Sequence, residues 1–173
     1  VYRFATESQL PVHVHSQIIE PIGFERVQDP LLSPVLEYVL DVTMCIGKMM
    51  MSGTFKKFPK VPFVFPHYGG VLPFVKERFD STYRMLRGRE YVADLGQLPS
   101  ECFQNLFFDT SGSKSIASLQ CALEVTDAAH ILFGSDFPAN SQPGPALDAV
   151  RGSGLKQDEI DKILGSNMLS LIQ

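Results

Sequence analysis

Two patterns of apolar and polar positions alternate along the chain, one typical of strands and one of helices. Short apolar runs rich in β-branched and aromatic residues predict buried parallel strands at residues 12–15, 61–65, 105–109 and 130–135. Apolar positions at helical spacing predict helices over residues 2–9, 33–52, 71–88, 113–127, 144–151 and 157–172. Strands that alternate with helix-length spacers are joined as parallel neighbours by right-handed crossovers. The pattern therefore predicts an α/β fold.

Polar residues stand near the carboxyl end of every predicted strand, namely His15, His67, Asp109 and Asp136. Parallel strands bring these ends to one edge, where α/β sheets and barrels keep their chemistry. The simpler alternative is that such residues form turns or cap helices, and for Asp109 we favour the turn. The repetition at all four strands predicts a functional rim.

The residue types at this rim favour metal chemistry. Two histidines and a carboxylate suit zinc with water in an open position, and manganese or iron is also compatible with them. His67 precedes Gly69-Gly70 and is either a ligand or a general base. His13 shares a strand face with His15, but we interpret it as an interior structural histidine. The rival is a metal-free acyl hydrolase that uses Ser135, although Gly134-Ser135-Asp136 lacks the second glycine of a nucleophile elbow.

Composition and charge mainly exclude other classes of protein. The 173 residues are 45% hydrophobic, which is enough for one domain with a sizeable core. The net charge is -4 and the basic residues are scattered, so neither nucleic acid nor a membrane surface is the expected partner. No apolar run approaches the roughly 18 residues that span a bilayer. Three distant cysteines without a CxxC motif favour a reducing, cytoplasmic location.

Several segments, taken in order, resemble the amidohydrolase-related (amidohydrolase 2) family. They are Leu10 to His15, His67-Tyr68-Gly69-Gly70 followed by Leu72-Pro73-Phe74 and Arg78, Phe107 to Thr110, Phe133 to Pro138, and Ile163 to Asn167. This family contains aminocarboxymuconate semialdehyde decarboxylase and γ-resorcylate decarboxylase. The resemblance extends over nearly the whole chain.

The resemblance implies a (β/α)8 TIM barrel of the metal-dependent hydrolase superfamily. The usual reaction of the resembled family is nonoxidative decarboxylation, and some relatives hydrolyse C–C, ester or lactone bonds. Matched residue by residue, His15 and Asp136 are implied to bind the metal, most simply Zn2+ with Mn2+ as a second possibility. His67 is implied to activate metal-bound water or to transfer a proton. Arg78 is implied to reach across a dimer interface to a substrate carboxylate, with which a guanidinium forms a bidentate contact.

Only half of the family barrel is represented in the sequence. Four of eight strands are recognisable, and the His-x-His pair of the family's first strand has no counterpart. We therefore interpret residues 1–173 as a single partial barrel domain, the C-terminal half with strands five to eight. The sequence begins with Val1 instead of an initiator methionine, and its first residues have the pattern of the middle of a helix. We therefore expect a fragment or a processed product.

We predict a metal-dependent decarboxylase (carboxy-lyase) or hydrolase that acts on a small aromatic or muconate-like carboxylic acid. The full-length parent is expected to be a homodimer. The alternative from a different class is a truncated, noncatalytic remnant that lacks the first-strand metal ligands.

Overall fold

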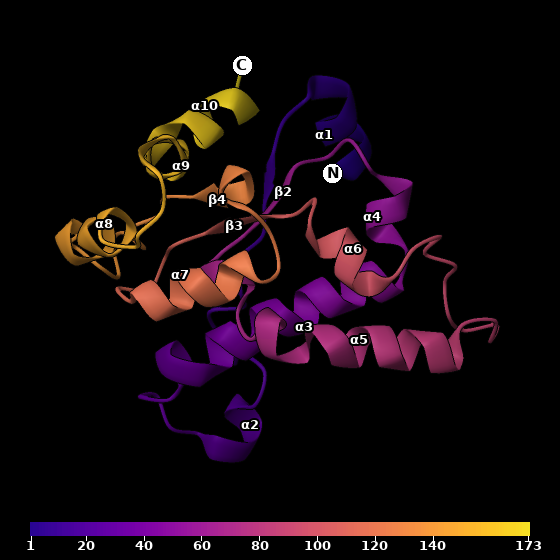
Figure 1. Ribbon diagram of the computed structural model, residues 1–173. Helices are drawn as coiled ribbons and strands as arrows, with labels where there is room; N and C mark the ends of the chain where they lie inside the picture. Colours follow the sequence, from indigo (N-terminus) through magenta and orange to yellow (C-terminus); the bar gives the residue numbers. More distant parts are fainter.

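The computed structural model describes residues 1–173 except the side chain of Val27, and it shows an open parallel sheet. The strands are β1 (Val12–His13), β2 (Phe63–Phe65), β3 (Phe107–Asp109) and β4 (Ile131–Leu132), and they pair in the order β1-β2-β3-β4 (Figure 1). Each pair of neighbouring strands is parallel. All four predicted strands are confirmed, although every ladder is shorter than its apolar run.

The helices follow the predicted order. They are α1 (Tyr2–Ser8), α2 (Phe24–Val27), α3 (Tyr38–Met51), α4 (Thr54–Lys57), α5 (Leu72–Leu86), α6 (Pro99–Phe103), α7 (Ile116–Leu123), α8 (Gly144–Arg151), α9 (Gln157–Asp161) and α10 (Asn167–Leu171). A π-helical turn at Ser33–Glu37 precedes α3, and another at Lys162–Ser166 joins α9 to α10. The short helices α2, α4 and α6 were not predicted.

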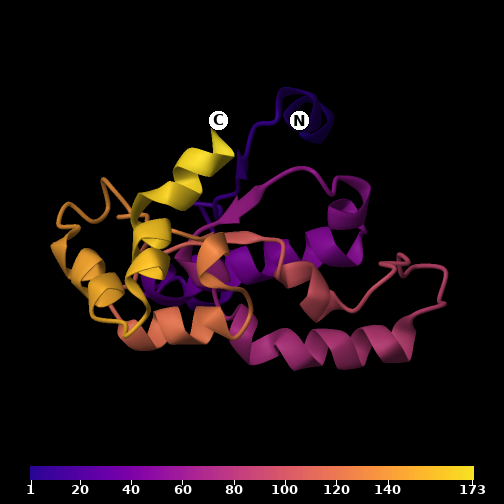
Figure 2. The same cartoon turned by 45° about the horizontal axis from the view of Figure 1, so that its top comes forward.

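Phenyl rings fill the core between the sheet and its helices. Figures 1 and 2 show α3, α5 and α7 along one side of the sheet, with α8 to α10 following β4. Phe63, Phe65, Phe103 and Phe108 are buried almost completely. A strand that is apolar at every position, as β2 is, must be covered on both faces, which explains why its pattern does not alternate.

The two edges of the sheet remain open in the described chain, because β1 and β4 each pair on one side only. A closed barrel would leave no such edge. His13 on β1 is exposed, so the interpretation of His13 as an interior histidine is wrong for this structure. An open four-stranded sheet of this kind agrees with the predicted partial barrel.

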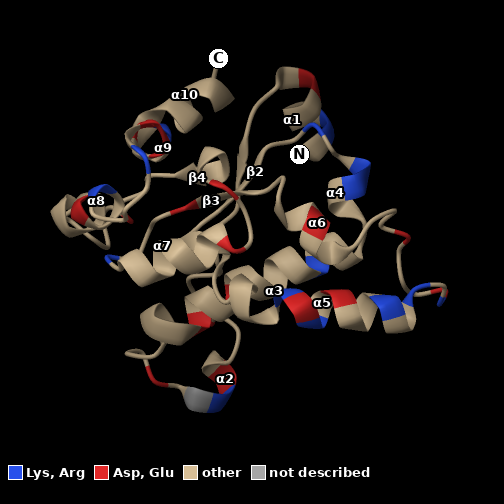
Figure 3. Ribbon diagram, in the orientation of Figure 1, with Lys and Arg blue, Asp and Glu red and all other residues tan. Residues whose placement is uncertain are grey.

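The charged side chains are spread over the molecule rather than gathered on one face. Figure 3 shows Lys and Arg on several helices, among them α1, α4 and α5, interspersed with Asp and Glu. Within the described residues, none of the helices combines the length and the apolar character needed to cross a membrane.

A close backbone contact sets α3 against the turn that follows β2. Gly70 has φ +74°, and a Cβ built there would lie 2.3 Å from Val39 O and 2.3 Å from Thr43 Oγ1. The Thr43 hydroxyl lies 3.0 Å from Val39 O and 3.2 Å from Gly69 O, and it accepts a hydrogen bond of 2.9 Å from Val71 N. Thr43 therefore joins the helix to both sides of the turn.

Replacing Gly70 by alanine tests this contact. We expect Gly70→Ala to lower the free energy of unfolding by roughly 2–5 kcal/mol, because it adds steric overlap to a left-handed φ. Gly88→Ala is the matched control, since Gly88 also has positive φ but nothing lies within 4 Å of its Cβ position. Its expected cost is only about 1 kcal/mol. Equal losses for the two variants in urea denaturation would contradict the contact.

Candidate active site

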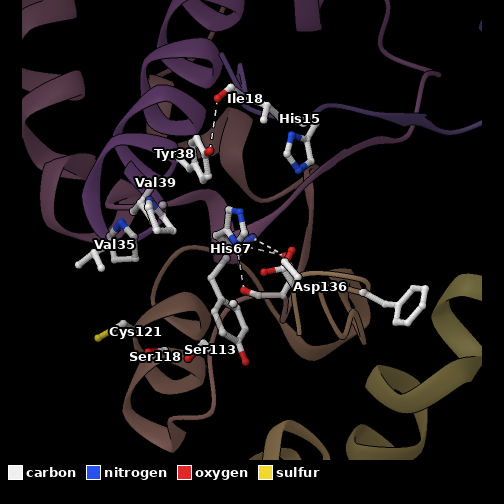
Figure 4. A pocket seen from close by; sticks show the side chains of 18 of the residues that line it. His15, Ile18, Val35, Tyr38, Val39, His67, Ser113, Ser118, Cys121 and Asp136 are labelled. Carbon is white, nitrogen blue, oxygen red and sulfur yellow. Dashed lines mark hydrogen bonds between the residues drawn. The ribbon is translucent and has the colours of Figure 1, made fainter. Parts of the chain in front are cut away.

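A cavity of about 1060 Å3 opens at the carboxyl ends of the strands. Each strand is followed by a residue that lines it: His15 after β1, His67 after β2, Ser111 after β3 and Asp136 after β4. Figure 4 shows the side chains of His15, His67 and Asp136 around the same space. The structure therefore brings together three of the four predicted site residues.

His15 is exposed and its ring is oriented by its own loop. Its Nδ1 lies 2.8 Å from the carbonyl oxygen of Ser16. A carbonyl only accepts, so Nδ1 carries the proton of the neutral ring and Nε2 keeps a free lone pair. Metal-binding histidines are commonly oriented by this kind of bond.

His67 is held in the same way from the loop after β3. Its Nδ1 donates to Ser111 O over 3.1 Å, which again leaves Nε2 free. The ring centroids of His15 and His67 are 6.4 Å apart and the rings meet edge to face. Two imidazoles with free Nε2 atoms therefore lie next to one another at the cavity.

The backbone that carries His67 is in an unusual conformation. His67 and Tyr68 have φ values of 56° and 55°, and Gly69 and Gly70 both have 74°. Non-glycine residues in this region carry strain of about 1–3 kcal/mol each and persist only where their surroundings hold them. The turn is therefore a place where tertiary contacts override the local preference of the chain.

Asp109 supplies part of that support. Its Oδ1 accepts hydrogen bonds from Ser111 N over 2.9 Å, from the Ser111 hydroxyl, and from His67 N over 3.2 Å. The bond from Ser111 N closes a turn in which the Asp109 side chain accepts from the backbone two residues later, which is the role that we predicted for Asp109. The bond to His67 N was not predicted, and it ties the loop after β2 to the loop after β3.

Gly112 allows His67 and Asp136 to approach each other. A Cβ on Gly112 would lie 2.8 Å from His67 Nδ1 and 3.8 Å from Asp136 Oδ2. Its φ is +70°, and Asp136 itself has φ 66°. The three residues meet where the loops after β2, β3 and β4 converge.

Tyr68 contributes a neutral phenol to the cavity wall. Its side chain is buried, and burial raises the pKa of the hydroxyl, with the nearby Asp109 carboxylate raising it further. The phenol therefore stays protonated across the physiological pH range.

Two other candidates lie away from the cavity. Arg78 is on the exposed side of α5 and is not among the lining residues, whereas Phe74, one turn earlier on that helix, lines the cavity. Ser135 does not line it either, so nothing in this geometry favours the acyl hydrolase. Contact between Arg78 and the substrate of a partner subunit stays a prediction.

Several lining residues that sequence reasoning missed come from helical segments. Val35 reaches the cavity from the π-helical turn before α3, Val39 from the start of α3, and Ser118 and Cys121 from α7. Their only signal in the sequence was helical spacing, which is equally typical of core positions.

Comparison with known proteins identifies the family of this chain. The profile of the amidohydrolase family designated amidohydrolase 2 matches residues 1–169. The chain is 31% identical over 122 residues to decarboxylase orsB of Emericella nidulans, covering 69% of this chain and 36% of that protein. It thus spans about a third of that relative.

Solved structures of similar fold include two decarboxylases. The chain matches 5-carboxyvanillate decarboxylase LigW of Sphingomonas paucimobilis with a TM-score of 0.88 and 24% identity, covering 99% of this chain and 52% of that one. Dihydroxybenzoic acid decarboxylase of Polaromonas sp. JS666, solved with manganese and the inhibitor 2-nitroresorcinol, matches with a TM-score of 0.84 and 20% identity. This second match covers 99% of the present chain and 52% of the Polaromonas chain. The fold therefore corresponds to half of these larger chains.

The contact at Gly112 gives a test of the site geometry. Gly112→Ala should displace the His67 ring, because its Cβ would overlap Nδ1 at 2.8 Å. We expect clear shifts of the His67 ring signals in NMR spectra and a loss of stability of about 1–3 kcal/mol. Gly154→Ala, at a positive φ with nothing within 4 Å, should leave those signals in place. Unmoved His67 signals in Gly112→Ala would show that the loops do not meet as described.

Proposed function

This chain belongs to the amidohydrolase 2 family, and we propose that it forms half of the active site of a metal-dependent decarboxylase. The substrate class is a small aromatic or muconate-like carboxylic acid. One observation supports this proposal above all others: His15, His67 and Asp136 surround one cavity at the carboxyl ends of parallel strands. The decarboxylases named among the relatives and solved structures support the reaction type.

The donor atoms at the cavity suit a divalent metal. His15 presents Nε2 because Nδ1 bonds the Ser16 carbonyl, and Asp136 presents a carboxylate. Within the described residues, no group of three or more His, Cys, Asp and Glu side chains is placed to hold a metal. We therefore propose that His15 and Asp136 supply two ligands and that the missing strands of the barrel supply the others.

Nitrogen and oxygen donors are compatible with either zinc or manganese, and manganese is present in the related dihydroxybenzoic acid decarboxylase. When bound, the metal would act as a Lewis acid that orients the substrate's carboxylate and an adjacent hydroxyl. His15 and Asp136 would thereby fix the end of the substrate that loses CO2.

His67 is proposed to transfer the proton. Because Nδ1 is bonded to Ser111 O, the proton moves through Nε2, which is free toward the cavity. Protonated His67 donates from Nε2 to the ring carbon that bears the carboxylate. The bond from that carbon to the carboxylate then breaks, its electron pair returns to the ring, and CO2 leaves with His67 neutral.

The proposal extends to the assembly and the location of the whole protein. Arg78 is exposed one turn beyond Phe74. In a homodimer, its guanidinium would reach the active site of the other subunit and bind a carboxylate of the substrate there. The three cysteines are free, which supports a reducing compartment such as the cytoplasm.

Metal content tests the ligand assignment. We expect the longest gene product that contains these residues to bind about one Mn2+ or Zn2+ per chain. His15→Ala and Asp136→Ala should each weaken binding by roughly 10–100-fold or more, measured by elemental analysis after dialysis against a buffered chelator. His13→Ala is the matched control, since His13 is exposed and does not line the cavity. Unchanged metal content in both ligand variants would exclude the assignment.

Turnover tests the role of His67. His67→Ala should keep the metal but slow CO2 release from hydroxybenzoates by about 10²–10⁴-fold, the usual contribution of a positioned acid or base. Ser135→Ala, next to the proposed ligand Asp136 but outside the cavity lining, should retain turnover. Normal turnover in His67→Ala would rule out the proton transfer.

A further inference from the structure

Two oxygen atoms of Ser111 face the ring of His67, and one of them is able to donate as well as accept. The Nδ1 atom of His67 lies 3.1 Å from Ser111 O and 3.3 Å from Ser111 Oγ. A carbonyl oxygen only accepts, whereas a hydroxyl accepts through its lone pairs or donates its one proton. The tautomer of His67 therefore depends on where the hydroxyl proton of Ser111 points.

The carboxylate of Asp109 takes that proton. An ionised carboxylate can only accept, and Asp109 Oδ1 accepts the hydrogen bond of the Ser111 hydroxyl. The backbone N of His67 donates to the same hydroxyl oxygen over 3.1 Å. With its proton directed to Asp109, the Ser111 hydroxyl has only lone pairs left for His67 Nδ1.

Burial makes the direction of this hydroxyl matter. Ser111 is 5% exposed, and a buried hydroxyl that loses its acceptor is strongly driven to find another. Without the Asp109 carboxylate, the hydroxyl can turn and donate to His67 Nδ1, 3.3 Å away. The neutral ring would then carry its proton on Nε2 instead of Nδ1.

We propose that Asp109 is a positioning residue that acts through Ser111. By holding the hydroxyl proton, it keeps neutral His67 in the tautomer with Nδ1 protonated and Nε2 free. This inference rests on the proposed function of His67 as the proton donor. Donation from Nε2 of the protonated ring leaves the remaining proton on Nδ1, so the neutral product forms directly in the tautomer that both Ser111 oxygens stabilise.

Loss of this control should slow turnover without weakening substrate binding. A ring whose Nδ1 accepts from the Ser111 hydroxyl must give up that bond before it can be protonated there. We expect Asp109→Ala to lower kcat for CO2 release by roughly 10–100-fold, an effect of the size usual when the partner of an oriented histidine is removed. KM should change little, because Asp109 does not line the cavity.

Nitrogen NMR of the imidazole rings tests the tautomer directly. Spectra are recorded on the longest gene product in the presence of Zn2+, at a mildly alkaline pH where a free imidazole is neutral. The His67 signals are identified by their loss in His67→Gln. We expect the proton on Nδ1 in the unchanged protein, and a shift of both ring signals toward the other tautomer in Asp109→Ala.

A second substitution separates this role from a merely structural one. Adding Ser111→Ala to Asp109→Ala removes the hydroxyl that donates to Nδ1, so the double variant should regain the original tautomer and part of the lost kcat. Ser113→Ala in place of Ser111→Ala is the matched control, since Ser113 lines the same cavity and its hydroxyl accepts from Ser115 N over 3.3 Å. Asp109→Cys, whose sulfur accepts only weakly, provides the same test if Asp109→Ala fails to fold.

The outcomes separate this proposal from the decarboxylase itself. The expected tautomer changes, without CO2 release from hydroxybenzoates by any form of the protein, would support the role of Asp109 and reject the decarboxylase. CO2 release with an unchanged tautomer in Asp109→Ala would overturn the role of Asp109 and leave the decarboxylase standing. A proton on Nε2 in the unchanged protein, or no greater recovery with Ser111→Ala than with Ser113→Ala, would also overturn that role.

Discussion

The position of His67 depends on one constraint, the left-handed backbone of residues 67–70. Two of these four residues are not glycine, and such conformations persist only when their surroundings over-determine them. Here the support comes from two sides. Asp109 accepts a hydrogen bond from His67 N on the side of the sheet, and Thr43 bonds Gly69 and Val71 on the side of α3. The arrangement of the proposed active site follows from this double attachment.

Strand ends and helices contribute differently to the cavity. The loops after the strands provide His15, His67 and Asp136, whereas α3 and α7 provide much of the remaining wall. This division is usual where parallel strands end at a common edge. It also explains why the sequence predicts which polar residues gather at the cavity but not the shape of its wall. His15, His67 and Asp136 stand out at the ends of apolar runs, but Val39 reads as an ordinary core position of an amphipathic helix.

The order of helices and strands was predictable from the sequence. The differences between the predicted and the observed elements have physical causes. The run at 12–15 gives a ladder of only two residues, because β1 is an edge strand with a neighbour on one side only. Helices α2, α4 and α6 have four or five residues, too few for an apolar period to emerge. The second bond of Asp109 joins loops 42 residues apart, a pairing that no local pattern encodes. Arg78 depends on a second chain, about which one sequence carries no geometric information.

The long sequence separations of these bonds bear on the order in which the molecule assembles. The hydrogen bond from His67 N spans 42 residues, and that between Thr43 and Gly69 spans 26. Loop-closure entropy must be overcome before such contacts stabilise anything. The turn at His67 cannot adopt its final form until β2, β3 and α3 have docked. A partly folded chain therefore retains no active-site geometry, and any local opening of α3 dismantles the site before it unravels the sheet.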